Sequence, residues 1–341
     1  MQSLLFSPLK IGDLQIKNRI VMPPMCMYKA KEGNGLPRCF HRLHYAARAL
    51  GGVGLIIVEA SAVEPRGRIT NRDLGLWNDE QQEAHAGLVK ECAKYGAVMA
   101  VQLAHAGRKS ECEGLIAPSA VKFSESYKTP RQMSAEDIVS VKQNFVRAAI
   151  RAQCAGYAAI EIHAAHGYLI SEFLSPRINL RDDEYGGSFE NRTRFLKEIL
   201  SEIKTAVQIP VGVRISAQSW VKGDWSLDDS VQLAKKLEAL GAAFIHVSTG
   251  GFFERTDSAP TVAPLYQASY AKAVKQAVGI PVIAVGLITK ASEGEALLLG
   301  GVCDAVAYGR ELLRNPNFAQ AAMSELGCSE LIENSYKRAF K

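Results

Sequence analysis

The chain repeats one unit, in which a helix-like segment ends at glycine and a short run rich in Val, Ile and Ala follows. Such runs follow Gly51–Gly52 (VGLIIVEA), Gly96 (AVMAVQLAHA), Gly156 (YAAIEIHAA), Gly241 (AAFIHVS), Gly279 (IPVIAVG) and Gly300–Gly301 (VCDAVAYG). Glycine ends a helix because it adopts the left-handed conformation at the C-cap. Apolar runs without a polar face are typical of strands buried on both sides. The repeat therefore predicts helices that alternate with parallel strands.

Eight strands are expected in total. They are placed near residues 19–23, 55–60, 97–103, 158–163, 210–216, 244–248, 281–285 and 304–308. Two of the intervening helices carry a Ser-x-x-Asp capping box, which begins at Ser134 and at Ser226. This alternation favours an α/β fold, the (β/α)8 TIM barrel. A doubly wound open sheet is the alternative, but no Gly-rich phosphate fingerprint opens the first strand-helix unit.

The whole chain, residues 1–341, is expected to form a single barrel domain, because such barrels run past about 250 residues. Residues 1–18 are predicted to contain a short β-hairpin that turns at Gly12 and Asp13 and caps the barrel bottom. Residues 326–341 are assigned to a C-terminal tail. Three long loops are expected, at residues 110–133, 175–192 and 249–264.

Composition excludes several classes of protein. The net charge of +5 suits a small anionic ligand but is too weak to favour a nucleic-acid partner. The seven cysteines are odd in number and contain no C-x-x-C pair, which favours reduced thiols in a cytoplasmic protein. The start lacks the pattern of a signal peptide, and no apolar stretch is long enough for a membrane helix. We therefore expect no membrane partner.

Polar and titratable side chains gather where the expected strands end, which is the rim that carries the active site in TIM barrels. They include Cys26 and Tyr28 after the first strand, Gln102 and Lys109 at the third, His163, His166 and Tyr168 at the fourth, Arg214 in the fifth and Arg310 after the eighth. Each alone is compatible with a structural role. Their concentration at one rim indicates an active site.

His163 and His166 form an H-x-x-H pair that permits two interpretations. A metal site, as in a metal-dependent lyase or aldolase, needs further ligands, and Glu161 is expected to alternate away from His163 along the strand. We therefore expect no metal. The other interpretation is that both imidazoles donate hydrogen bonds to a substrate oxygen. Tyr168 then lies close enough in sequence to act as a general acid.

Gly286, Gly309 and Arg310 follow the seventh and eighth strands, where many barrels bind phosphate through backbone N–H groups and an arginine. A phosphate site beside a ring of polar groups suggests a phosphorylated cofactor that lies across the barrel mouth. Flavin mononucleotide (FMN) has this shape, although sugar phosphates also fit.

These residues together resemble the Old Yellow Enzyme family of FMN-dependent ene-reductases, in particular the bacterial-type branch that contains YqjM and xenobiotic reductase A. The resemblance covers residues 5–340. Its motifs are PPMCMY at 23–28, QLAHAGRK at 102–109, EIHAAHGYLISEFLSP at 161–176, DEYGGSFENRTRF at 183–195, VRIS at 213–216 and GRELLRNP at 309–316.

The resemblance implies a set of flavin contacts. These are Pro23, Pro24, Met25, Cys26, Ala60, Gln102, His163, Arg214, Val285, Gly286, Gly309 and Arg310. Cys26 is expected near the N5 edge of the flavin, where it tunes the redox potential. Gln102 is expected to bind the pyrimidine edge, and Arg214 is expected to face N1 and O2. Lys109 is expected near the flavin at the active-site mouth.

The resemblance also implies the reaction, which is reduction of the activated C=C bond of an α,β-unsaturated carbonyl or nitro compound. His163 and His166 are expected to bind the substrate oxygen while flavin N5 gives a hydride. Tyr168 is the expected proton donor, and Tyr28 is expected to contact the substrate. NADPH or NADH is expected to reduce the flavin first, in the same pocket, which gives ping-pong kinetics.

A homodimer or homotetramer is expected, in which Arg338 of the C-terminal tail reaches a neighbouring active site as the resemblance implies. Two further interpretations stay open at this point. One is another FMN barrel, similar to dihydroorotate dehydrogenase, although that class lacks the HAAH element. The other is a flavin-binding scaffold without turnover.

Overall fold

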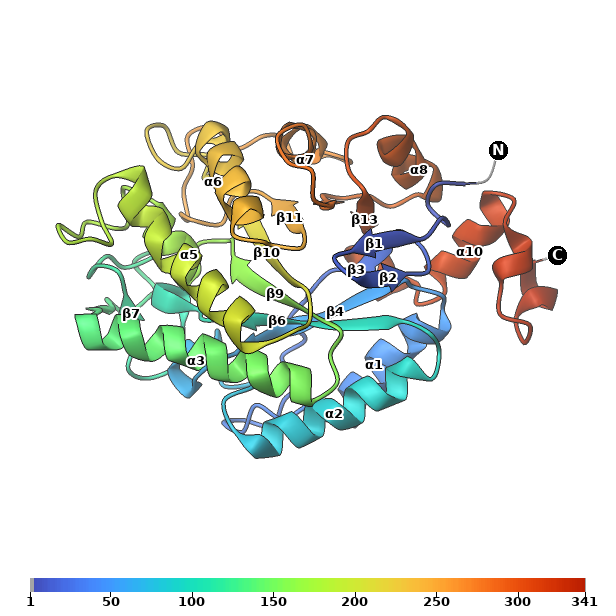
Figure 1. Ribbon diagram of the computed structural model, residues 1–341, viewed down its shortest axis with the longest axis horizontal. Coiled ribbons are helices and arrows are strands. Elements are labelled where there is room, and N and C mark those ends of the chain that lie inside the picture. Colours follow the sequence, from blue (N-terminus) through green and yellow to red (C-terminus); the bar gives the residue numbers. More distant parts are fainter. Residues whose placement is uncertain (1–2, 341) are drawn as a thin grey trace.

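The computed structural model describes residues 3–340, and in it eight parallel strands close into a barrel that is surrounded by helices (Figure 1). The barrel strands are β3 (Ile20–Met22), β4 (Leu55–Ala62), β6 (Val98–Ala104), β9 (Ala159–Ala164), β10 (Val211–Ser216), β11 (Ile245–Ser248), β12 (Val282–Val285) and β13 (Ala305–Ala307). The barrel closes because β3 pairs with both β13 and β4. This closure confirms the predicted TIM barrel and excludes the open sheet.

The barrel floor is closed by the predicted hairpin, β1 (Leu9–Ile11) and β2 (Leu14–Ile16), which are antiparallel. Gly12 takes the left-handed conformation that the turn requires, with φ of 59°. Ile11 and Ile16 are fully buried and pack with Phe244 and other residues that point into the barrel. The hairpin therefore buries its apolar side by plugging the N-terminal end of the barrel.

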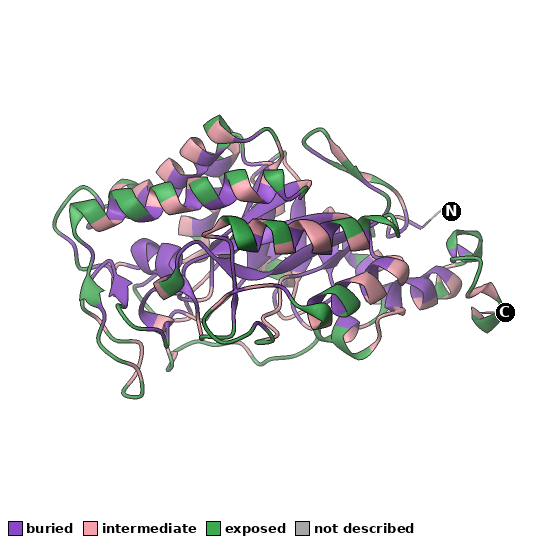
Figure 2. Cartoon of the chain, turned by 90° about the horizontal axis from the view of Figure 1, so that it is seen from below, coloured by how far each residue is buried: buried purple, intermediate pink, exposed green. Residues whose placement is uncertain are grey.

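Helices cover the outside of the barrel and bury only the side that faces the strands (Figure 2). They are α1 (Cys39–Leu50), α2 (Asp79–Ala93), α3 (Ala135–Cys154), α5 (Phe189–Ala206), α6 (Leu227–Ala239), α7 (Ala268–Lys275), α8 (Ala291–Leu299) and α10 (Phe318–Glu325). The predicted capping boxes are confirmed, because Ser134 accepts from the Asp137 N–H and Ser226 accepts from the Asp229 N–H. Gly279 corrects the predicted pattern. It lacks a positive φ and donates instead to Glu238.

Short elements fill the loops at the C-terminal ends of the strands, and the sequence did not indicate them. They are η1 (Pro65–Gly67), β5 (Leu74–Gly75), η2 (Gly107–Lys109), β7 (Ile116–Ala117), β8 (Arg131–Gln132), α4 (Leu169–Leu174) and α9 (Arg310–Arg314). The tail adds η3 (Ser329–Leu331) and η4 (Lys337–Phe340), and it lies at the hairpin end of the molecule (Figure 1). Within residues 3–340, no helix is long and apolar enough to cross a membrane.

Candidate active site

Three hollows lie at the C-terminal mouth of the barrel, and together they hold most of the predicted site residues. The first is lined by Arg214, Ser248, Gln267, Val285, Gly286, Gly309 and Arg310. The second is lined by Ala60, Ala104, His163 and Tyr168, among others. The third is a cavity of about 750 Å³ that opens to solvent and is lined by Tyr28, Lys109, Phe123, Tyr127 and Tyr168. The fold therefore brings residues from all sides of the barrel to one mouth.

His163 and His166 lie side by side at the end of β9, with ring centroids 5.3 Å apart. The Ala165 N–H donates to Nδ1 of His163 at 3.2 Å, so the proton of a neutral His163 is on Nε2. His166 takes an unusual left-handed conformation, with φ of 61°, and its N–H donates to Ser216. Its Nε2 lies 2.8 Å from the hydroxyl of Ser248. Backbone and hydroxyl contacts thus fix both rings.

Both imidazoles are neutral in this environment. Burial lowers the pKa of His163 and of His166 well below the usual value for histidine, and the positive charge of Arg214 lowers it further. A neutral imidazole offers one N–H, which on His163 is Nε2–H. The pair is therefore suited to donate hydrogen bonds to a ligand oxygen rather than to form an ion pair.

Tyr168 and Lys109 complete the wall next to the histidines. The Tyr168 ring lies 5.1 Å from that of His163, and burial raises its pKa well above the usual value for tyrosine. Lys109 donates to the carbonyl oxygens of His166 and Gly251 at 2.9 and 3.2 Å. Its ammonium nitrogen lies 4.8 Å from the Tyr168 ring centroid, and burial lowers its pKa to about 8. Lys109 thus packs this wall at the cavity mouth.

A buried carboxylate holds the segment that carries Cys26 and Tyr28. Glu59 Oε2 accepts from the Met27 N–H at 2.8 Å, and Oε1 accepts from the Tyr45 hydroxyl at 3.1 Å. Tyr28, the next residue after Met27, is left-handed with φ of 54°. Burial raises the pKa of Cys26 well above the usual value, so Cys26 is a thiol rather than a thiolate.

Glu59 makes the stability of the protein depend on pH. Burial raises its pKa to about 7, above the usual value of 4.5, so the folded state binds more protons than the unfolded state between these two values. The free energy of unfolding is therefore expected to fall by about 1.4 kcal/mol per pH unit as pH rises through this window. Glu59→Gln should remove this contribution. The free energy of unfolding of the wild type and of Glu59→Gln, measured by denaturation at saturating FMN from pH 4.5 to 8, checks this prediction. If the two free energies changed with pH in parallel, the prediction would be contradicted.

The hollow at the C-terminal ends of β12 and β13 contains polar groups that none of the described residues satisfies. Arg214 is 7 % exposed, yet its guanidinium donates to no acceptor among residues 3–340, and its Nε is buried without a partner. Gln267 has an unpaired buried Oε1 in the same hollow. A Cβ on Gly309 would lie 3.6 Å from Met25 and 3.7 Å from Pro23, so the end of β3 adjoins Gly309. These unpaired groups fit an anionic, hydroxyl-bearing ligand such as FMN.

The structure corrects the expectation that Glu161 points away from His163. Side chains two residues apart on a strand share a face, and Glu161 is fully buried inside the barrel. It accepts from Gln102 Nε2 and from His246 Nδ1, both at 2.7 Å. Glu161 is thus occupied by hydrogen bonds. Within the described residues, no three His, Cys, Asp or Glu side chains form a metal-binding group.

Arg338 does not lie with the other predicted site residues of its own chain. It belongs to η4 in the exposed tail at the hairpin end, opposite the mouth (Figure 1).

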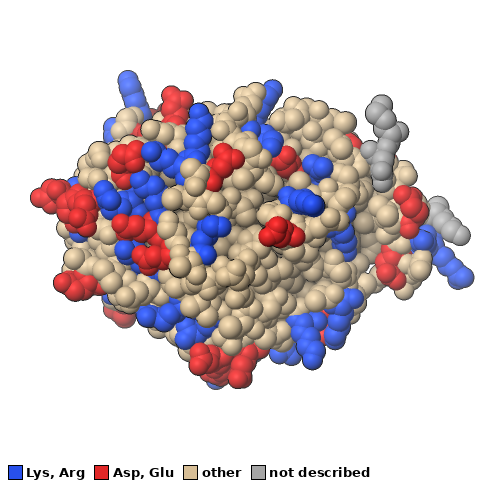
Figure 3. Space-filling model, in the orientation of Figure 1, with Lys and Arg blue, Asp and Glu red and all other residues tan. Residues whose placement is uncertain are grey.

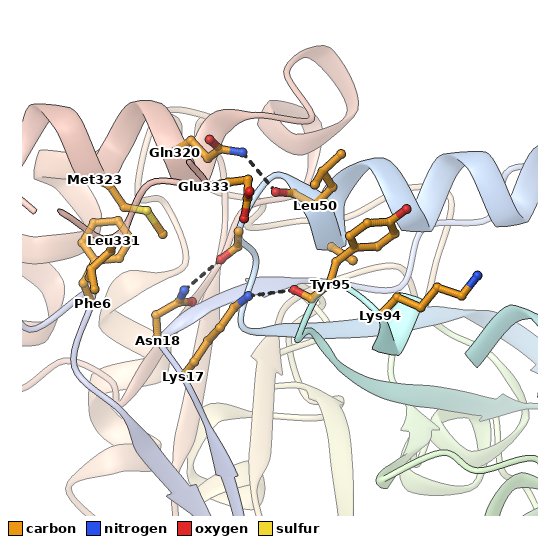
Figure 4. Close-up of a pocket in the computed structure, with 12 residues that line it drawn as sticks. Phe6, Lys17, Asn18, Leu50, Lys94, Tyr95, Gln320, Met323, Leu331 and Glu333 are labelled. Atoms are coloured by element: carbon orange, nitrogen blue, oxygen red, sulfur yellow. Dashed lines mark hydrogen bonds between the residues drawn. The ribbon is translucent and has the colours of Figure 1, made fainter. Parts of the chain in front are cut away.

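Nearby, a cavity of about 300 Å³ opens between the hairpin and α10, where Phe6, Lys17 and Gln320 converge (Figure 4). Its Gln320 amide already donates to Leu50. Since TIM-barrel chemistry takes place at the other end, we assign this cavity no role in catalysis.

Sequence reasoning missed four groups that shape the site, namely Glu59, Ser216, Ser248 and Gln267. Ser216 and Ser248 are the last residues of β10 and β11, so reading the ends of the fifth and sixth strands would have found them. Gln267 precedes α7 and carries no strand-end signal.

On the face drawn in Figure 3, basic and acidic side chains are mixed. The absence of a nucleic-acid partner stays a prediction.

At one mouth of this TIM barrel lie an unpaired buried arginine, two neutral histidines and the hollow around Gly309 and Arg310. Together they define the class of flavin-binding barrel oxidoreductases. Comparisons with known proteins agree. The family model described as "NADH:flavin oxidoreductase / NADH oxidase family" matches residues 4–327. The chain belongs to this family, the Old Yellow Enzyme family. It is a flavin-dependent oxidoreductase that uses FMN and NAD(P)H.

Relatives match over nearly the full chain. The NADPH dehydrogenase of Bacillus subtilis is 46% identical over 341 residues, which is 100% of both chains. The NADPH dehydrogenase of Listeria monocytogenes is 46% identical over 99% of this chain and 100% of its own. Among solved structures, morphinone reductase has a TM-score of 0.83 at 28% identity, covering 95% of this chain and 90% of its own. The old yellow enzyme homologue of Zymomonas mobilis has a TM-score of 0.82 at 28% identity, covering 94% and 92%.

Proposed function

We propose that the protein is an ene-reductase that reduces the activated C=C bond of α,β-unsaturated carbonyl or nitro compounds. The observation that supports this most is the pair of neutral imidazoles at the mouth, with Nε2–H of His163 fixed by the Ala165 contact. Nε2–H of His163, together with Nδ1–H of His166 when the Ser248 hydroxyl donates to its Nε2, matches one carbonyl or nitro oxygen. Hydrogen bonds to that oxygen stabilise the negative charge that it gains as the alkene is reduced.

FMN, when bound, supplies the hydride. Gln102, Arg214, Gly309 and Arg310 are the residues proposed to hold it, together with the segment from Pro23 to Cys26 and with Ala60, Val285 and Gly286. The unpaired guanidinium of Arg214 is well placed to stabilise negative charge on a bound ligand. Cys26, held as a thiol on the segment that Glu59 fixes, is proposed to tune the redox potential.

Tyr168 is the proposed proton donor to the α-carbon. Its raised pKa keeps the hydroxyl protonated, and its ring packs against His163 next to the proposed oxygen site. Tyr28 lines the same cavity as Tyr168 and is the proposed substrate contact on the other side. One cavity of about 750 Å³ then has to serve both the nicotinamide coenzyme and the enone. Shared use of one cavity supports ping-pong kinetics.

We infer a homodimer or homotetramer in which Arg338 of one subunit reaches the mouth of another, since this residue lies far from its own mouth. The seven free cysteines are consistent with a cytoplasmic protein.

The proposed function predicts a colour cycle. The purified holoenzyme should be yellow, and anaerobic NADPH or NADH should bleach it. Cyclohexenone added afterwards should restore the colour, because the enone takes the hydride and is reduced to the saturated ketone. The flavin absorption followed in a stopped-flow spectrometer checks both halves. A protein that bleaches but regains no colour with enones or nitroalkenes would contradict ene-reduction while leaving the NADPH dehydrogenase activity.

A further inference from the structure

A buried hydrogen-bonded cluster lies inside the barrel next to Arg214, and the proposed reaction does not use all of it. Glu161 is at its centre, with one carboxylate oxygen accepting from Gln102 and the other from His246, each at 2.7 Å. Glu161 and His246 are 0 % exposed, and Gln102 is 2 % exposed. The three side chains come from β9, β6 and β11.

The carboxylate fixes which way the Gln102 amide points. An ionised carboxylate only accepts hydrogen bonds, so the NH2 group of Gln102 has to face Glu161. The carbonyl Oε1 of Gln102 then points the other way, and none of the hydrogen bonds among residues 3–340 uses it. The pyrimidine edge of a flavin offers one N–H donor, at N3, between two carbonyl acceptors. An amide that presents Oε1 matches the donor, whereas a flipped amide would place NH2 against N–H.

The same carboxylate balances the charge of Arg214. Arg214 pairs in register with His246 on the neighbouring strand, and Glu161 is the leading nearby charge that favours its protonated form. His246 donates through Nδ1, and its Nε2 is buried without a partner, as expected for a neutral imidazole. One buried negative charge therefore lies close to one buried positive charge, which weakens the positive field that Arg214 sets up at the mouth.

We propose that Glu161 is a positioning residue for the flavin: it orients Gln102 toward N3–H and offsets the positive charge of Arg214, which lowers the flavin redox potential. This inference rests on the proposed function for the assignment of Gln102 and Arg214 to the pyrimidine edge. It assigns Glu161 no contact with substrate.

Glu161→Gln is nearly isosteric and changes both effects: it removes the charge, and its amide, which is a donor as well as an acceptor, no longer forces the NH2 group of Gln102 to face it. The FMN dissociation constant, measured from FMN fluorescence released on dilution of the holoenzyme, should rise about tenfold, the cost of roughly one misdirected hydrogen bond. The two-electron midpoint potential should rise by about 30 mV, which corresponds to reduced FMN gaining about tenfold over oxidised FMN. If Glu161 had only a structural role, Glu161→Gln would leave the midpoint potential unchanged.

Two further variants test the mechanism. Asp224→Asn is the control. Asp224 is another buried carboxylate at this end of the barrel, and it accepts hydrogen bonds from the Ser175 hydroxyl and the Arg177 N–H. Its replacement should leave the flavin potential unchanged. Gln102→Ala tests the coupling. Glu161→Gln should weaken FMN binding no further in the Gln102→Ala background, but it should still raise the potential.

The outcomes are distinct. Glu161→Gln with wild-type FMN affinity and potential, or with an effect on affinity that simply adds to that of Gln102→Ala, would overturn the inference. If Glu161→Gln does not fold, Glu161→Asp serves, because it keeps the charge and moves the carboxylate. It should weaken FMN binding through Gln102 at an unchanged potential, and additive losses would again overturn the inference. Neither readout requires enone turnover, so a failure of ene-reduction is recognised separately.

Discussion

Tyr168→Phe is expected to slow enone reduction by about 10²–10³-fold while NADPH still bleaches the flavin at close to the wild-type rate. The reason is that general acid catalysis by a positioned side chain contributes roughly this much, and only the half-reaction with the enone needs the proton. The phenyl ring keeps the packing against His163 and under the Lys109 ammonium. Rapid-mixing measurements of the two half-reactions, made separately, check the prediction.

The matched control is Tyr185→Phe, which removes a hydroxyl bound to Glu198 away from the mouth and should change neither half-reaction. If Tyr168→Phe slowed both half-reactions equally, its hydroxyl would be acting on the flavin site or the fold rather than as the proton donor. A solvent isotope effect on enone reduction that disappears in the variant would support proton donation.

His163→Ala combined with His166→Ala is the second variant with a large expected effect. Enone and phenol affinity should fall about 10²-fold, because two hydrogen bonds of about 1–1.5 kcal/mol each are lost. FMN should stay bound, since Arg214 and the hollow around Gly309 are untouched. Equilibrium titrations of the oxidised holoenzyme, followed by flavin absorption, measure both properties.

His44→Ala is the control for losing a buried imidazole, since His44 stacks on Phe40 in α1 and lies outside the mouth. It should leave ligand affinity unchanged. Loss of FMN from the double variant, together with unchanged enone affinity once FMN is restored, would refute the role assigned to the pair.

Much of the fold could be predicted because its signals are local. Each barrel strand is an apolar run, and each of the helix starts at Ser134 and Ser226 is indicated by a four-residue Ser-x-x-Asp motif. The family motifs likewise placed His163, Tyr168 and Arg214 at one rim, because each follows or ends such a run.

The Glu161 cluster could not be found in this way. Its partners Gln102 and His246 lie on other strands, and the contacts depend on register, which pairs Gln102 with Glu161 and Arg214 with His246. No local pattern encodes that register. The wrong expectation for Glu161 came from misapplying the alternation rule, since residues two apart on a strand share a face and do not point apart.

Glu59 was hidden by an irregularity of the backbone. The pairing of β4 with β6 shifts register between Val58 and Ser61, and this bulge brings Glu59 to Tyr45 on α1 and to the Met27 N–H. A bulge changes which face a side chain takes, and it depends on the neighbouring strand rather than on the residues alone. The sequence therefore indicated the residues that are proposed to contact ligands, but not the buried carboxylates that hydrogen-bond to their neighbours.

The central claim is that His163 and His166 bind a substrate oxygen above the flavin. It is tested most directly by titrating the oxidised holoenzyme with p-hydroxybenzaldehyde and recording the flavin spectrum. We predict a broad long-wavelength charge-transfer band, because the phenolate oxygen is held by the two imidazoles with its ring over the flavin, and we predict that the band is absent in the double alanine variant. A band of equal strength and affinity in that variant, or phenol binding to the wild type without any band, would contradict the claim.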